Sequence, residues 1–120
     1  MNDTIAISTE FISQTCVVVT LSGRFDAASA NVLKDTFKGI IGGTITRVVV
    51  DMEGVSFVDS AGLSALITGL KLIRDIGGRL TICSLQPQAK AVFELTKLDQ
   101  IVGMYPTRQS AIAAATQSTS

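Results

Sequence analysis

The sequence predicts a single α/β domain with a mostly parallel central sheet and an antiparallel N-terminal strand. Runs of β-branched residues alternate with segments of helical periodicity in the order β-β-α-β-α-β-α-β-α. Strands that alternate with helices become parallel neighbours in one sheet. The 120 residues, 47% of them hydrophobic, suit one core. Without a repeat or linker, we expect one domain over residues 1–116 and a frayed polar tail at 117–120.

The N-terminal part predicts a hairpin followed by a helix. Residues 4–8 alternate in polarity, and residues 15–21 are rich in valine and threonine, so both are expected to be strands. Their short polar link predicts antiparallel pairing near a sheet edge. Residues 22–26 read as a loop, and Asp26 is a good cap for the next helix. That helix should end at the glycine pair 42–43, and its apolar face is formed by Ala30, Leu33, Phe37 and Ile40.

The centre of the chain predicts a buried strand, a loop and a second helix. Residues 47–52 contain three consecutive valines, a pattern typical of a strand covered on both faces, and Asp51 lies at its carboxyl end. A loop is expected at 53–58. The helix that starts at Asp59-Ser60 should end at the glycine pair 77–78, with an apolar face of Leu63, Leu66, Ile67, Leu70 and Ile73.

The C-terminal part predicts two more strand–helix pairs. Strands are expected at 79–84 and 101–105. Pro87 marks a helix start, and Thr107 can cap a last helix through residue 115.

Composition excludes several classes of function. Histidine is absent, which removes serine–histidine and cysteine–histidine catalysis and most zinc sites, so no metal or cofactor is expected. The formal net charge is zero with scattered lysines and arginines, which argues against a nucleic-acid partner. No segment is apolar enough for membrane insertion, and the N-terminus lacks a signal peptide, so a cytoplasmic location is expected. Cys16 and Cys83 are expected to be buried, reduced thiols.

Chemistry concentrates where the predicted strands end. In open α/β sheets, ligands and partners meet the carboxyl ends of the strands. Arg24 and Asp26, Asp51, and the Asp59-Ser60 pair all follow predicted strands, so they are expected to converge on one end of the molecule. Each also has a plain structural interpretation. Asp59-Ser60 can be an ordinary cap pair, Asp51 can hydrogen-bond the loop at 53–57, and Arg24 can be a solvated loop charge.

Ser60 is the candidate for modification. In the first turn of a helix, the backbone N–H groups are unpaired and the helix dipole is positive, so a phosphate is tolerated there. The added charge would disturb a bound partner and leave the fold intact. Gly62 in the same turn has two interpretations: it lets another backbone or a kinase approach, or it makes room for the strand-to-helix turn.

An enzyme is not expected. The Asp-Ser-Ala-Gly turn lacks the glycine two residues before the serine that a nucleophile elbow needs, and no histidine can activate the Ser60 hydroxyl. The phosphate-cradling glycine motifs of nucleotide-binding proteins are also missing.

The order of elements and several motifs resemble the STAS domains of the anti-sigma factor antagonist type. The resemblance spans nearly the whole chain and includes LSGRFD at 21–26, VVVDM at 48–52, VSFVDSAGL at 55–63 and GGRL at 77–80. The Phe-x-Asp-Ser-x-Gly-Leu segment is the most specific of these. The family's fold is a small sheet partly covered by helices.

The resemblance implies a partner-switching cycle. The unphosphorylated protein would bind an anti-sigma factor that is also a serine kinase, phosphorylation of Ser60 would release it, and a PP2C-type phosphatase would reverse the modification. The residues expected to bind the partner are Arg24, Asp26, Asp51, Ser56, Asp59, Ala61, Gly62 and Leu63.

Two positions depart from the family's pattern. Arg24 stands where many relatives carry an acidic residue. Ala61 replaces a common serine or threonine and leaves Ser60 the only hydroxyl in the turn. Ser56 and Ser64 lie nearby and are less favoured acceptors. Two alternatives stay open: a non-switching STAS interaction subunit of a transport or stressosome-like assembly, and a small-molecule sensor with its ligand at the strand ends.

Overall fold

The computed structural model describes residues 6–116 and confirms the predicted order of strands and helices. The expected tail at 117–120 and the start of the first predicted strand lie outside these residues. The five strands are β1 (Ala6–Phe11), β2 (Cys16–Phe25), β3 (Arg47–Val58), β4 (Arg79–Cys83) and β5 (Gly103–Tyr105). The helices are α1 (Ala27–Ile40), α2 (Ser60–Asp75), α3 (Pro87–Leu95), a short 3₁₀ turn η1 (Leu98–Gln100) and α4 (Arg108–Thr116).

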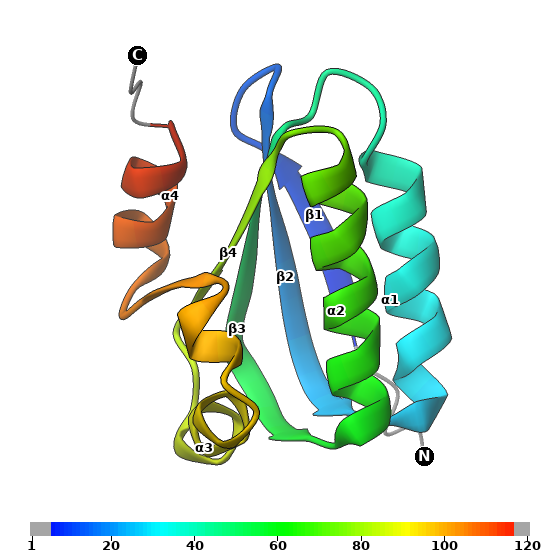
Figure 1. Ribbon diagram of the computed structural model, residues 1–120, viewed down its shortest axis with the longest axis vertical. Coiled ribbons are helices and arrows are strands. Elements are labelled where there is room, and N and C mark those ends of the chain that lie inside the picture. Colours follow the sequence, from blue (N-terminus) through cyan, green and yellow to red (C-terminus); the bar gives the residue numbers. More distant parts are fainter. Residues whose placement is uncertain (1–5, 117–120) are drawn as a thin grey trace.

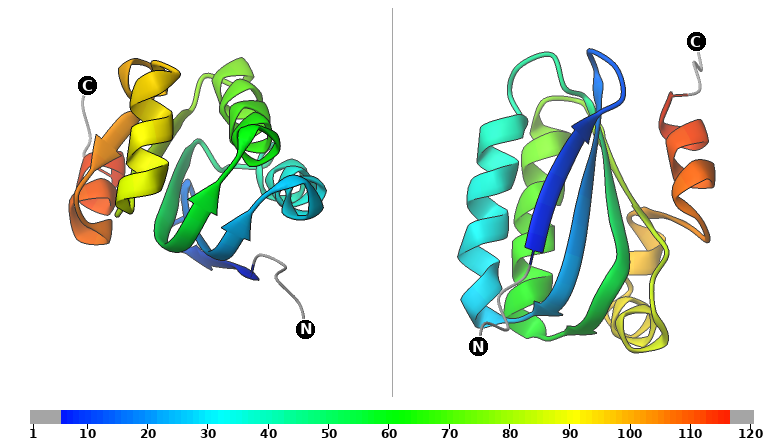
Figure 2. Two further views of the ribbon diagram at one scale, coloured as in Figure 1. Left: turned by 90° about the horizontal axis from the view of Figure 1, so that it is seen from below. Right: turned by 180° about the vertical axis from the view of Figure 1, so that it is seen from behind.

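The strands form one sheet in the order β1-β2-β3-β4-β5. The edge strand β1 pairs antiparallel with β2, and all other pairs are parallel, as the sequence predicts. Helices α1, α2 and α3 pack on one face, and α4 lies on the other (Figures 1 and 2). Residues 6–116 contain no helix with the length and apolar character that crossing a membrane requires.

The main core lies between the sheet and the first three helices. The predicted apolar faces are confirmed, since Leu33 and Phe37 of α1 and Ile73 of α2 are fully buried against the strands. A smaller cluster under α4 contains both cysteines, which are buried and free. Burial, followed by the nearby Asp51 carboxylate, raises the pKa of Cys83 to about 11, so this thiol stays protonated at neutral pH.

Two segments that the sequence predicts as loops are strands. Residues 22–25 extend β2 and residues 53–58 extend β3, and the two extensions pair with each other. Gly23 and Gly54, which resemble loop residues, lie where the pairing register shifts. Gly23 has a φ of 106°, and a Cβ on Gly54 would lie 2.6 Å from the Ser22 Cβ. Glycine inside a strand commonly marks such a bulge. Here the two glycines allow β2 and β3 to continue through the residues that the sequence predicts as loops.

Candidate functional site

Ser60 is the first residue of α2, and it is exposed at the end of the sheet where β2 and β3 finish. The preceding residue, Asp59, caps the helix as predicted. Its Oδ1 accepts a hydrogen bond of 2.9 Å from the Gly62 backbone N–H. The Asp59 N–H donates to the Phe25 carbonyl at 3.2 Å, which ties the turn to the end of β2. The Ser60 hydroxyl therefore stands on a short, hydrogen-bonded turn with open solvent in front of it.

The start of α1 lies beside the start of α2. Phe25 at the end of β2 pairs with Val58 at the end of β3, so α1 and α2 begin at the same end of the sheet (Figure 1). Asp26 caps α1 by accepting from the Ala28 N–H at 3.1 Å, which confirms its predicted role. The buried Ser29 hydroxyl lies 3.2 Å from the same Asp26 oxygen and 2.8 Å from the Arg24 carbonyl.

Arg24 lies on β2 and not in a loop. Its guanidinium stands over the Phe57 ring, 4.2 Å from the ring centroid, and its Nε is 4.0 Å from Asp26 Oδ2. Arg24 and Phe57 are register partners on neighbouring strands, so the contact follows from the extended pairing. A stacked cation at an exposed site contributes about 0.5–1 kcal/mol. Arg24 thus brings a positive charge to the end of the sheet where Asp26 and Asp59 lie.

Gly62 and Leu63 belong to the interior. A Cβ at Gly62 would lie 2.2 Å from the Phe25 carbonyl oxygen and 2.8 Å from its carbon. The close approach that Gly62 permits is therefore that of the chain's own β2, which favours the interpretation that it makes room for the turn. Leu63 is buried in the core. Of the other residues expected on this surface, Ser56 is exposed and Ala61 is half-buried.

The expected convergence is wrong for Asp51. The β3 strand continues to Val58, so Asp51 lies seven residues before its end, roughly 20 Å along an extended chain. Asp51 is buried on the α4 side of the sheet. Its Oδ1 accepts from the Glu53 N–H at 3.0 Å, which confirms the predicted bond to the segment that follows. Asp51 therefore serves the other face and does not join the Ser60 turn.

The partner of Asp51 is Arg108, which sequence reasoning missed. Arg108 Nη1 lies 3.3 Å from Asp51 Oδ2 and 2.9 Å from the Thr20 hydroxyl, and Nη2 pairs with Glu10. A buried carboxylate needs a charged or donating partner. The sequence therefore indicates that a buried Asp51 needs a partner, but no feature of it identifies Arg108, 57 positions later, as that partner. The cluster attaches the start of α4 to the sheet.

Two glutamines at the start of α3 were also missed. Gln88 Oε1 accepts from the Val58 N–H at 2.9 Å, and its Nε2 donates to the Val58 carbonyl at 3.0 Å. Gln86 Nε2 donates to the Glu53 carbonyl at 2.6 Å. The sequence marks this segment only as a helix start. These bonds connect α3 to the part of β3 that leads into the Ser60 turn.

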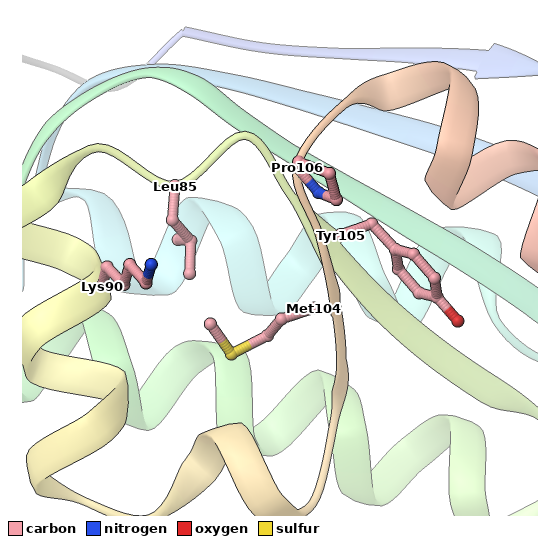
Figure 3. Close-up of a pocket in the computed structure, with 5 residues that line it drawn as sticks. All are labelled: Leu85, Lys90, Met104, Tyr105 and Pro106. Carbon is pink, nitrogen blue, oxygen red and sulfur yellow. The ribbon is translucent and has the colours of Figure 1, made fainter.

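A hollow of about 380 Å³ lies apart from the turn, at the carboxyl ends of β4 and β5. In Figure 3 the side chains of Leu85, Lys90 and Met104 point into it from three segments, and the Tyr105 ring points away. The remaining lining residue is Pro106. Its wall is largely apolar with one lysine. None of the residues at the Ser60 turn lines it.

The arrangement at Ser60 offers an exposed hydroxyl on a capped helix start. The chain has no histidine, and residues 6–116 hold no cluster of three acidic or cysteine side chains that could bind a metal ion. Asp59 Oδ1 accepts from a backbone N–H. A phosphate on Ser60 would lie at the N-terminus of α2, where the helix dipole favours negative charge.

The chain belongs to the family of STAS domains, whose family model matches residues 6–111. It is 29% identical over 98 residues to BtrV of Bordetella bronchiseptica, which carries the name of an anti-sigma factor antagonist; the match covers 82% of this chain and 84% of the relative.

Solved structures agree with the fold. An anti-sigma factor antagonist from Mycobacterium paratuberculosis superposes with a TM-score of 0.86 at 25% identity, covering 98% of each chain. Unphosphorylated SpoIIAA, an anti-sigma factor antagonist, superposes with a TM-score of 0.82 at 22% identity and covers 96% of this chain and all of its own. The fold also occurs in a sulfate transporter family protein of Wolinella succinogenes, with a TM-score of 0.77 at 17% identity and 88% of each chain covered.

Proposed function

We propose that this chain is a cytoplasmic anti-sigma factor antagonist that works by partner switching and is not itself an enzyme. Unphosphorylated, it binds an anti-sigma factor that is also a serine kinase. Phosphorylation of Ser60 releases the partner, and a PP2C-type phosphatase restores binding. The observation that carries the proposal is the position of Ser60: an exposed hydroxyl on a capped helix start, in a chain whose relatives carry that name.

The physical basis of the switch is the contrast between the surface and the core at this turn. Ser60 faces solvent, and Leu63 and Leu66 hold the same helix in the core. A phosphate adds nearly two negative charges at neutral pH and a bulky hydrated group. A partner that covers the turn would have to desolvate that group, whereas the helix dipole favours it within the domain. Modification therefore costs binding and leaves folding almost unchanged.

The test is phosphorylation by the cognate serine kinase with ATP, read by intact mass and peptide mapping. A single phosphate on Ser60 is expected, and Ser60→Ala should remove it. Ser64→Ala is the matched control, because Ser64 is an exposed serine one turn further along α2. Phosphate that persists in Ser60→Ala would show that the acceptor is elsewhere. Ser60→Glu should weaken kinase binding in a titration, and equal binding of both proteins would contradict switching.

The transporter neighbour and the hollow beside α3 motivate the two alternatives. A non-switching subunit of a transport or stressosome-like assembly would be captured with membrane or scaffold proteins and would bind equally well as Ser60→Glu. A small-molecule sensor would bind its ligand in the hollow lined by Lys90 and Met104. Calorimetry with nucleotides and fatty acids tests the sensor, and Lys90→Met should abolish any heat that comes from this site.

A further inference from the structure

The carboxyl half of β3 lacks a strand on one side. Pairing between β3 and β4 ends at Asp51 and Cys83, and within residues 6–116 no strand pairs with residues 52–58 on that edge. Backbone N–H and C=O groups near the core need partners, and an unpaired one costs free energy comparable to a lost hydrogen bond. Helix α3 packs beside this edge (Figures 1 and 2).

The Gln88 side chain replaces the missing strand at one residue. It accepts from the Val58 N–H at 2.9 Å and donates to the Val58 carbonyl at 3.0 Å, which are the two bonds that a paired residue in an antiparallel ladder exchanges. Gln86 supplies one bond to the carbonyl of Glu53, which lies earlier on β3. The start of α3 therefore holds the end of β3 at two points.

The peptide group between Val58 and Asp59 is consequently fixed at both of its polar atoms. The Val58 carbonyl accepts from Gln88 on one side, and the Asp59 N–H donates to the Phe25 carbonyl on the other. This peptide is the last one before the capped turn, so its orientation sets the direction in which Asp59 and Ser60 leave the sheet.

We propose that Gln88 is a positioning residue that fixes the Ser60 turn for phosphoryl transfer, an inference that rests on the proposed function. Phosphoryl transfer requires the attacking hydroxyl to be held close to the phosphate and in line with the leaving group. Gln88 does not touch Ser60. It acts through the Val58–Asp59 peptide, and without it this peptide is anchored on the β2 side alone.

Two near-isosteric variants separate the two bonds. Gln88→Glu keeps an acceptor for the Val58 N–H and places a carboxylate against the Val58 carbonyl, so it loses the donated bond. Gln88→Met loses both. Gln109→Glu is the matched control, since it makes the same chemical change at an exposed glutamine on α4.

Amide hydrogen exchange followed by NMR tests whether Gln88 holds Val58, and it needs no kinase. The protection factor of the Val58 amide should stay unchanged in Gln88→Glu and fall roughly tenfold or more in Gln88→Met. The protection factor of the Leu66 amide, in the core of α2, should stay unchanged in both variants. Unchanged protection of Val58 in Gln88→Met would overturn the proposal. A parallel loss at Leu66 would also overturn it, because Gln88 would then support the domain as a whole.

Steady-state phosphorylation by the cognate kinase tests the consequence. Both Gln88 variants should lower kcat roughly tenfold with KM for the protein within about twofold, and Gln109→Glu should match the wild type. Wild-type kinetics in Gln88→Met would overturn the positioning role. A wild-type protein that takes up no phosphate on Ser60 would instead contradict the proposed function, and the exchange result would still decide whether Gln88 holds the turn.

Discussion

Helices α1 and α2 begin side by side in almost the same way, and only one of them presents a hydroxyl at its first residue. Each follows a strand whose last residue pairs with that of the other, and each is capped by an aspartate. The first helical residue is exposed in both, but it is Ala27 in α1 and Ser60 in α2. The third is buried in both, as Ser29 and Gly62. The features that the two helices share form a helix start, and the hydroxyl that only α2 has at its first residue is the group that can be modified.

Moving the hydroxyl from α2 to α1 should give the largest effect. In the double variant Ala27→Ser, Ser60→Ala, the serine occupies an equivalent capped, exposed position on the neighbouring helix. We expect no phosphorylation by the cognate kinase, because the new site lacks the contacts that β3 and α3 make at Val58, just before the Ser60 turn. Intact mass after incubation with ATP measures this. Uptake of phosphate by the double variant at the start of α1 would mean that a capped serine alone suffices for recognition.

The third helical position should show the largest difference in stability. Gly62→Ala forces a Cβ into the Phe25 carbonyl, and such overpacking costs about 1–3 kcal/mol, here at the upper end because backbone must move. Ser29→Ala removes a hydroxyl that lies within hydrogen-bonding distance of two acceptors and should cost about 1 kcal/mol. Denaturant unfolding compares the two variants. Equal losses would show that the turn at Gly62 relaxes more easily than its contacts indicate.

The two caps should differ slightly. Asp59→Ala removes one cap bond and should cost about 1 kcal/mol. Asp26→Ala removes a cap bond and also the interaction with Ser29, so its cost should be larger by a few tenths of a kcal/mol or more. The same unfolding experiment measures both. A smaller loss for Asp26→Ala would show that Ser29 contributes little to the start of α1.

A negative charge at the first helical position should have the smallest effect on stability. Ser60→Glu and Ala27→Glu both place a carboxylate at an exposed helix N-terminus, where the dipole favours it by about 0.3–1 kcal/mol before the nearby cap aspartates offset part of the gain. Neither midpoint of thermal unfolding should move by more than about 4 °C. If only Ser60→Glu unfolds the domain, the charge would act on the fold and not on a partner.

The sequence predicts what depends on local chemistry. The caps Asp26 and Asp59 and the helical faces follow from spacing alone, and the structure confirms them. The loop prediction is wrong for both strand extensions, because their glycines resemble loop residues until the pairing partners are known. The Asp51–Arg108 and Val58–Gln88 contacts join residues 57 and 30 positions apart. A single chain carries no signal that selects such partners, so the sequence wrongly places Asp51 beside the Ser60 turn at one end of the molecule and does not single out Gln88.

The two register shifts in β3 also keep the inner face of this strand continuous. Between the pairs Thr20–Asp51 and Phe25–Val58, β2 advances five residues and β3 advances seven, so β3 carries two extra residues. At a bulge, two residues of one strand lie opposite a single residue of its partner, so later side chains stay on the faces of their partners in β2. The core residues Met52, Val55 and Val58 therefore follow one another three residues apart instead of two. This spacing hides the second half of β3 from any search for two-residue alternation.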